Sequence, residues 1–253
     1  MTPYYERAGI TIFCGDMRDV VPVLQLDRVG CVLADPPYAQ TSCAWDKWPD
    51  GWPGVLAACL PLAASMWCFG SLRMFLDRRD DFAAWSMSQD VVWEKQNGSS
   101  FHADRFRRVH EQAVHWYRGA WSDVYARPVT TADATARTAR RKTRPFHMGQ
   151  IDEGAYESHG GGPRLQRSVI RVPNCHGDGG KNETRKPLGI VEPLVSYALR
   201  PGAVLLDTFC GEGSALVVAK QRGSLAIGID SRENQCEAAA RKLDGVLSLG
   251  GAA

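Results

Sequence analysis

Seven short apolar runs are the feature of this chain that most restricts its fold. They lie at ITIFC (10–14), CVLA (31–34), SMWCF (65–69), DVVW (90–93), AVHWY (113–117), AVLLD (203–207) and LAIGI (225–229). Between several of them, as in 55–64 and 72–85, apolar residues recur at helical spacing. Near-continuous apolar strands alternating with helices are typical of a mostly parallel sheet that is covered by helices on both faces. We therefore predict an α/β fold.

This alternation is interrupted between Gly119 and Lys186, where aliphatic residues become rare and Thr, Ala, Arg and Gly accumulate. Only RSVIRV (167–172) reads as a strand there, and long irregular segments in compact domains are usually functional or disordered. A helical pattern follows at 188–199, with Pro187 in its first turn and Pro193 expected to kink or restart it. We predict one domain made of 1–118 and 186–253, with an insertion at 119–185.

The charge of the chain is small overall but uneven. The net charge is +2, whereas residues 105–144 hold ten Lys/Arg against three acids, a local net of +7, which leaves about −5 for the rest. Such an asymmetry is typical of a face that binds a polyanion. A basic loop that is merely solvated is the alternative.

Cysteine and histidine spacing argues against a metal site. The eight cysteines include no C-x-x-C pair and the six histidines lack zinc-site spacing, so we expect reduced cysteines and no metal. The longest apolar stretch contains Pro61 and is too short to span a bilayer. The N-terminus has no apolar signal region, which predicts a cytoplasmic protein.

The run CVLA is followed at once by Asp35-Pro36-Pro37-Tyr38. The two prolines stop the strand and remove two backbone donors. What remains is a rigid corner with a carboxylate, a carbonyl without a competing N–H, and an aromatic ring. Such a corner suits a planar group that carries an amino function, although the same four residues can also form a plain turn.

A second corner follows the strand AVLLD, in DTFCGEGSAL (207–216). Gly211 and Gly213 there allow a sharp turn and close approach of a ligand to the N-terminus of a helix that starts at Ser214. The next strand ends in Asp230, and an acid at this distance commonly holds ribose hydroxyls. Leu216 replaces the third glycine of a dinucleotide motif. S-adenosylmethionine, a nucleoside without phosphates, therefore fits better than a nicotinamide dinucleotide, which stays an alternative.

Together the two corners resemble the β-class DNA amino-methyltransferases, whose motifs are D/N/S-P-P-Y/F and F-x-G-x-G, in this order along the chain. GDMRDV (15–20) is similar to that family's Gly-Asp segment, VVWEKQNG (91–98) to its W-x-K segment, RRVHEQAVHWYRG (107–119) to its His-Glu segment, and RKP (185–187) to its Lys-Pro. Thr208 and Glu212 depart from the usual Pro and Ser, and NETRKP departs from H-P-T-x-K-P.

The resemblance implies a circularly permuted, Rossmann-like methyltransferase fold with a seven-stranded sheet. It makes 1–118 the catalytic half, 119–185 the variable target-recognition insertion and 186–253 the cofactor-binding half. S-adenosylmethionine is the implied cofactor. Its implied binding residues are Asp16, Asp35, Lys186, Asp207, Phe209, Gly211, Gly213, Ser214 and Asp230.

The implied catalytic residues are Asp35, Pro36, Pro37 and Tyr38. Asp35 and the Pro36 carbonyl would accept hydrogen bonds from the target amine, and Tyr38 would stack on a base that has left the duplex. Nearby Trp45, Trp48 and Trp52 are expected to pack in the core, or one of them to wedge or stack at DNA.

Double-stranded DNA is the expected partner, bound by a set of basic residues: Arg105, Arg107, Arg108, Arg140, Arg141, Lys142 and Arg144. Asp at the first motif position favours adenine N6 as the target, by resemblance. Cytosine N4, RNA, a nicotinamide-dependent oxidoreductase and a non-catalytic DNA-binding module are the alternatives. The sequence leaves open a homodimer, a partner nuclease and the recognition site.

Overall fold

The computed structural model describes residues 1–97, 103–140, 155–174 and 185–246. The chain divides into two compact units, one made of Met1–Arg127 with Ser168–Ala253 and the other of Pro128–Arg167. Each unit is described by itself. The smaller one lies inside the range predicted as the insertion.

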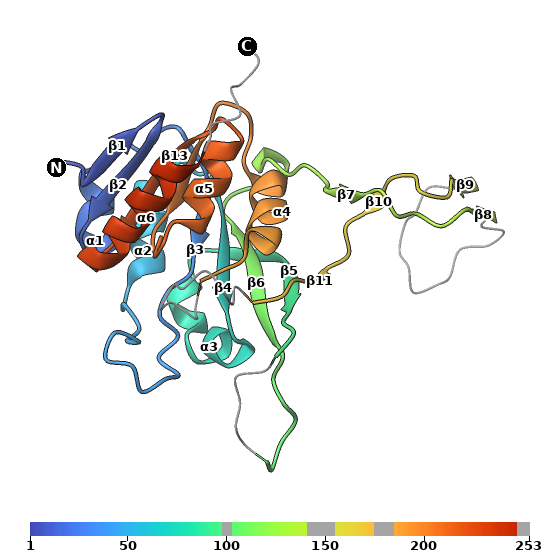
Figure 1. The fold of residues 1–253 in the computed structure, drawn as a ribbon, viewed down its shortest axis with the longest axis horizontal. Helices are drawn as coiled ribbons and strands as arrows, with labels where there is room; N and C mark the ends of the chain where they lie inside the picture. Colours follow the sequence, from blue (N-terminus) through green and yellow to red (C-terminus); the bar gives the residue numbers. More distant parts are fainter. Residues whose placement is uncertain (98–102, 141–154, 175–184, 247–253) are drawn as a thin grey trace. The chain divides into compact units, whose positions relative to one another are not determined.

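The larger unit is built on a nine-stranded sheet in the order β1-β2-β13-β12-β3-β4-β6-β5-β11 (Figure 1). The five strands from β2 to β4 in this order are parallel to one another, whereas β1 is antiparallel to β2, and β6 is antiparallel to both β4 and β5. The bounds are β1 Tyr5–Arg7, β2 Ile10–Cys14, β3 Val29–Ala34, β4 Ser65–Gly70, β5 Ser86–Glu94, β6 His110–Tyr117, β11 Val169–Arg171, β12 Val204–Asp207 and β13 Leu225–Asp230.

The predicted α/β class is confirmed, and each of the seven apolar runs is a strand. The predicted number of seven strands was too low, because a short strand was added at each edge. β1 has the sequence YER and is largely exposed, so it carries no apolar run that a pattern could detect. β11 is the strand expected within RSVIRV, and it pairs in parallel with β5 and so joins the main sheet.

Helices cover both faces of the sheet, as predicted (Figure 1). One hydrophobic cluster joins α4 (Leu188–Ala198), α5 (Ser214–Gln221) and α6 (Glu233–Gly245) to the sheet. A second joins α1 (Met17–Val20), α2 (Trp52–Cys59), α3 (Leu72–Asp77) and the 3₁₀ turns η1 (Val21–Val23) and η2 (Arg79–Phe82). Along β3, Cys31 and Leu33 face the first cluster and Val32 and Ala34 the second, the alternation expected of a strand buried on both sides.

Helix bounds differ from the predicted ranges for local reasons. α2 begins at Trp52 and ends at Cys59, before Pro61, because the residue ahead of a proline is disfavoured in helical conformation. The range 72–85 holds α3 and η2 in place of one helix. α4 is a single helix that contains Pro193, where a kink or restart was expected.

The smaller unit contains two antiparallel strand pairs. β7 (Thr130–Thr131) pairs with β10 (Arg164–Leu165), and β8 (Arg137–Arg140) pairs with β9 (Ala155–Ser158). Arg140 is the last residue of β8, whereas the predicted DNA-binding residues Arg141, Lys142 and Arg144 lie outside the described residues. A further 3₁₀ turn, η3 (Trp121–Asp123), belongs to the larger unit. Among the described helices, none is long and apolar enough to cross a membrane.

Candidate active site

Three acidic residues lie at one edge of the sheet because the strands that carry them are parallel neighbours. Asp35 directly follows β3, while Asp207 ends β12 and Asp230 ends β13. All three line one cleft with a volume of about 1360 Å³. Pockets for a single small ligand usually measure roughly 300–1000 Å³, so this cleft has room for a cofactor and a second group.

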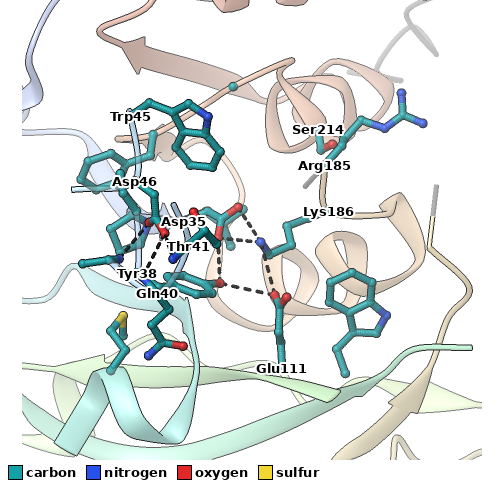
Figure 2. Close-up of a pocket in the computed structure, with 18 of the residues that line it drawn as sticks. Asp35, Tyr38, Gln40, Thr41, Trp45, Asp46, Glu111, Arg185, Lys186 and Ser214 are labelled. Atoms are coloured by element: carbon teal, nitrogen blue, oxygen red, sulfur yellow. Dashed lines mark hydrogen bonds and ion pairs between the residues drawn. The ribbon is translucent and has the colours of Figure 1, made fainter. Parts of the chain in front are cut away.

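Asp35 is the centre of a hydrogen-bonded cluster of four side chains (Figure 2). Lys186 Nζ donates to both carboxylate oxygens of Asp35, at 2.6 Å each. The Tyr38 hydroxyl donates to Asp35 Oδ1 at 3.0 Å and lies 3.4 Å from Glu111 Oε2. Glu111 Oε2 is also 3.4 Å from Lys186 Nζ, so the ammonium stands between two carboxylates.

A second lysine completes this cluster. Lys95, which follows β5, forms an ion pair with the Oε1 atom of Glu111 and lies over the Trp93 ring, 4.5 Å from its centroid. Glu111, on β6, therefore holds one lysine on each oxygen. Asp35 and Glu111 together balance the charges of Lys186 and Lys95.

The environments push the pKa values of the two carboxyls apart. Burial raises the pKa of Asp35 above its usual value, against the opposing effect of Lys186. Burial acts in the same direction on Glu111, but Lys186 and Lys95 outweigh it and lower the pKa of Glu111 to about 2. Burial lowers the pKa of the Lys186 ammonium, but the charges of Asp35 and Glu111 outweigh this and raise it. Glu111 is thus a fixed negative charge, and Asp35 is the carboxyl that is easier to protonate.

The glycine corner brings backbone N–H groups to the same cleft. Gly211 and Gly213 have φ angles of +49° and +77°, a region that disfavours residues with a Cβ. This turn lets the Gly211 N–H donate to Asp230 Oδ2 at 2.9 Å. Gly213 is the N-cap of α5, so the turn leads directly into the helix N-terminus.

The carboxylates of Asp207 and Asp230 differ in the number of hydrogen bonds that they accept. Asp230 is buried and also accepts from the backbone N–H and the guanidinium of Arg232, at 3.0–3.2 Å. Asp207 is equally buried, yet among the described residues its one hydrogen-bond donor is the Phe209 N–H, at 3.3 Å. Burial raises the pKa of Asp207 well above its usual value. The cleft therefore contains a buried carboxyl with spare acceptor capacity.

The loop after Tyr38 is held by Asp46 (Figure 2). The Asp46 carboxylate accepts from the backbone N–H groups of Ala39, Gln40 and Thr41, at 2.8, 2.9 and 2.7 Å. Ala39 has a φ of +53°, a conformation that costs energy for an alanine and that these hydrogen bonds stabilise. This arrangement fixes the chain that leaves the Asp35–Tyr38 corner.

The structure brings together most of the residues predicted for the site. The cleft is lined by Asp35, Pro36, Pro37, Tyr38, Lys186, Asp207, Phe209, Gly211, Ser214 and Asp230, and by the predicted DNA-binding residues Arg105 and Arg108. Asp16, Gly213 and Arg107 are not among its lining residues. Asp16 is the N-cap of α1, and its carboxylate accepts from the backbone and the guanidinium of Arg18.

Sequence reasoning missed four residues that the cleft uses: Lys95, Glu111, Asp46 and Arg232. Lys95 and Glu111 lie in the W-x-K and His-Glu segments, which were singled out without a role. Asp46 stands eleven residues after Asp35 in an irregular loop, where no periodic pattern marks it.

A family model described as DNA methylase, of the N6/N4 methyltransferases, matches residues 29–241. The chain belongs to this family. Among curated proteins it is 21% identical to the type II methyltransferase M2.DpnII of Streptococcus pneumoniae, over 96% of this chain and 92% of the relative. It is also 21% identical to M2.LlaDCHI of Lactococcus lactis subsp. cremoris, with the same coverage.

Solved structures show the same fold. The M1.HpyAVI–SAM complex aligns with a TM-score of 0.59 and 19% identity, over 92% of this chain and 99% of that one. The cytosine-N4-specific PvuII DNA methyltransferase aligns with a TM-score of 0.66 and 12% identity, over 99% and 90%. The Thermus thermophilus protein TTHA0409, solved in complex with S-adenosyl-L-methionine, aligns with a TM-score of 0.54 and 15% identity, over 92% and 94%. These relatives support a Rossmann-like methyltransferase fold, as predicted.

Proposed function

We propose that this DNA methylase transfers a methyl group from S-adenosylmethionine to the exocyclic N6 of adenine in duplex DNA. The observation that carries the proposal is the shared cleft, in which the Asp35 corner and the glycine corner with Asp230 face the same space. One corner offers acceptors for an amine, and the other offers a turn and an acid for a nucleoside.

The residues of the glycine corner fit S-adenosylmethionine. Asp230 would hold the ribose, and the Gly211–Ser214 turn at the N-terminus of α5 would lie along the ligand. The spare acceptor capacity of Asp207 suits a cationic ligand that carries N–H donors. Asp16 stays proposed for the adenine end, since the N–H of its neighbour Gly15 donates to the Asp230 carbonyl at 3.0 Å. When bound, S-adenosylmethionine supplies an electrophilic methyl group.

The Asp35 corner would then make the target amine nucleophilic. The Asp35 carboxylate and the Pro36 carbonyl would each accept one N–H of the amine, which localises its lone pair and stabilises positive charge that develops on nitrogen. Among the described residues, none donates a hydrogen bond to the Pro36 carbonyl, so this acceptor is available. Tyr38, tied by its hydroxyl to Asp35, would present its ring to the base.

At least one of the two hydrogen bonds from Lys186 to Asp35 has to break for this reaction. Its ammonium occupies both oxygens of the carboxylate that the amine needs, and it would repel charge that develops on the amine nitrogen. Glu111 offers the lysine a second anchor 3.4 Å away. Lys186 is also one of the residues implied to bind the cofactor, and a carboxylate of the cofactor would offer it a third.

Each alternative function makes different demands on the same residues. Cytosine N4 carries the same kind of amine, and the PvuII enzyme acts on it with a similar fold, so the preference for adenine rests on Asp35 as the first residue of its motif. A nicotinamide-dependent oxidoreductase would need a glycine at position 216, where the helix packs closely on the strand, but this position is Leu216. A module that only binds DNA would leave the buried Asp35 cluster without a purpose.

DNA contacts are proposed for Arg105, Arg107 and Arg108, all of which are exposed, and for the cluster at 140–144. Action on cellular DNA would place the protein in the cytoplasm.

Methylation-aware sequencing of DNA from a methylation-free host that expresses the protein tests the function. We expect N6-methyladenine at one short sequence, and unmodified DNA from a host that expresses Asp35→Ala. N4-methylcytosine would change the target base but not the mechanism, and unmodified DNA with the wild-type protein would contradict the proposal.

A further inference from the structure

Phe106 is the most exposed large apolar side chain among the described residues. It is 100% exposed, compared with 68% for Leu165, the next highest value. Arg105 and Arg107 flank it in the chain and Arg108 follows, and all three are exposed, although the Arg105 guanidinium is paired with Asp104 at 2.7–2.8 Å. A single exposed apolar residue is common at protein surfaces. A fully exposed aromatic ring next to arginines suits nucleic acid, whose phosphates are anionic and whose bases have flat apolar faces.

The fold places this residue at the catalytic edge of the sheet. β6 runs antiparallel to β4, and β4 runs parallel to β3, so the N-terminal end of β6 lies at the edge where β3 ends in Asp35. The Lys95 N–H donates to the Val109 carbonyl at 2.7 Å and closes the base of the loop between β5 and β6. The described part of this loop extends beyond the two strands, away from the sheet (Figure 1).

Contacts and shape tie this loop to the reaction site. Phe106, Arg105 and Arg108 line the same cleft as Asp35. Arg108 Nη1 also donates to Gln40 Oε1 at 3.4 Å, and Gln40 belongs to the loop that Asp46 holds behind the catalytic corner. The fully exposed ring therefore stands on the rim of the site that the target base has to enter.

The three tryptophans, which were expected to pack in the core or, for one of them, to wedge or stack at DNA, already have partners for their rings. Trp48 and Trp52 are 7% and 0% exposed and pack in the core with Phe82. Trp45 is half-exposed, and Arg232, which holds Asp230, covers its ring at 5.2 Å. Among the described residues, no side chain covers the ring of Phe106 on this rim.

We propose that Phe106 is a wedge that inserts into the base stack of DNA at the position which the target base leaves. Extraction of a base breaks its stacking on both neighbours, and an aromatic ring that fills the gap restores part of that stacking. Arg105, Arg107 and Arg108 bind the phosphates around the gap and bring the ring to it. This inference rests on the proposed function, since it assumes a base that leaves the duplex.

The test compares single-turnover methyl transfer by Phe106→Ala on two duplexes that contain the site identified by sequencing. One is fully paired, and in the other the target base stands opposite an abasic position, where its extraction breaks no base pair and the stack is already interrupted in the opposite strand. We expect Phe106→Ala to be slower on the paired duplex by roughly tenfold or more and on the abasic duplex by less than about twofold. Phe106→Trp, which keeps an aromatic face, is expected to retain most of the rate on the paired duplex.

Val23→Ala is the matched control, because Val23 is an apolar residue of η1 that is 63% exposed and does not line the cleft. It is expected to leave both rates unchanged. Equal slowing of Phe106→Ala on both duplexes, or no slowing on either, would overturn the wedge. Failure of the wild-type protein to methylate any DNA would instead refute the proposed function, so the two failures are distinguishable.

Discussion

Replacement of Lys186 by methionine removes the one ammonium that stands between Asp35 and Glu111. Methionine keeps much of the length and apolar volume of lysine but cannot donate the two hydrogen bonds of 2.6 Å to Asp35. Glu111 keeps Lys95 as a partner, whereas Asp35 keeps, among the residues that the structure describes, only the Tyr38 hydroxyl. The variant therefore leaves a carboxylate that is 26% exposed without its counter-ion, a change that costs about 3–5 kcal/mol where the carboxylate is fully buried and less where water reaches it.

Protonation of Asp35 sets an upper limit on that cost. Asp35 can escape by taking up a proton, and protonation of a carboxyl with an ordinary pKa of 3.8 costs about 4 kcal/mol at pH 7 and about 2 kcal/mol at pH 5. The folded variant then binds a proton that the unfolded chain lacks. Its stability relative to the wild type therefore recovers as the pH falls from 7 towards 3.8.

Urea unfolding at pH 7 and pH 5 measures this difference. We expect Lys186→Met to lose up to about 4 kcal/mol at pH 7 and up to about 2 kcal/mol at pH 5. Addition of Asp35→Asn to Lys186→Met should restore most of the loss at pH 7, because the uncompensated charge is then gone.

Lys220→Met is the matched control. Lys220 is also buried, but its ammonium donates to the Leu243 carbonyl at 2.6 Å and has no carboxylate partner in the described structure. Its loss should cost stability equally at both pH values. A pH-independent cost for Lys186→Met, or a double variant no more stable than Lys186→Met, would refute the idea that Lys186 is the counter-ion of Asp35.

Three further variants probe other parts of the site. Asp230→Ala should weaken binding of S-adenosylmethionine in calorimetry, and unchanged affinity would move the ribose site elsewhere. Asp46→Ala should lower the free energy of unfolding by about 2 kcal/mol in urea, because three backbone N–H groups lose their acceptor, whereas an unaltered midpoint would refute its role in the loop. The third variant replaces Arg105, Arg107 and Arg108 together by alanine. It should reduce the slope of log affinity for DNA against log salt concentration by up to about 3, and an unaltered slope would exclude phosphate contacts of these residues.

Local chemistry was enough to predict the strands and both corners. The runs that became β3, β12 and β13 are apolar throughout because both of their faces are buried, and this is visible in the sequence. β1 escaped prediction because YER carries no such signal and is held at the sheet edge by its pairing with β2. The residues after β3 and β12 stood out because prolines and glycines restrict the backbone there.

The contacts inside the cleft depend on distant parts of the chain and could not be predicted in this way. Lys186 and Asp35 are 151 positions apart, and their ion pair follows from where α4 and β3 pack. The sequence predicted Lys186 as a cofactor-binding residue, a role that stays proposed, and did not predict its contact with Asp35. Lys95 and Glu111 meet because β5 and β6 pair in antiparallel fashion.

Single-turnover methyl transfer by Asp35→Ala, measured beside its affinity for S-adenosylmethionine, tests the central claim most directly. We expect transfer to duplex DNA to be abolished while calorimetry shows nearly unchanged cofactor affinity, because Asp35 is proposed to act on charge that develops during the reaction. Asp27→Ala, at an exposed aspartate ahead of β3, is the control and should transfer at the wild-type rate. Substantial transfer by Asp35→Ala would contradict the proposed mechanism.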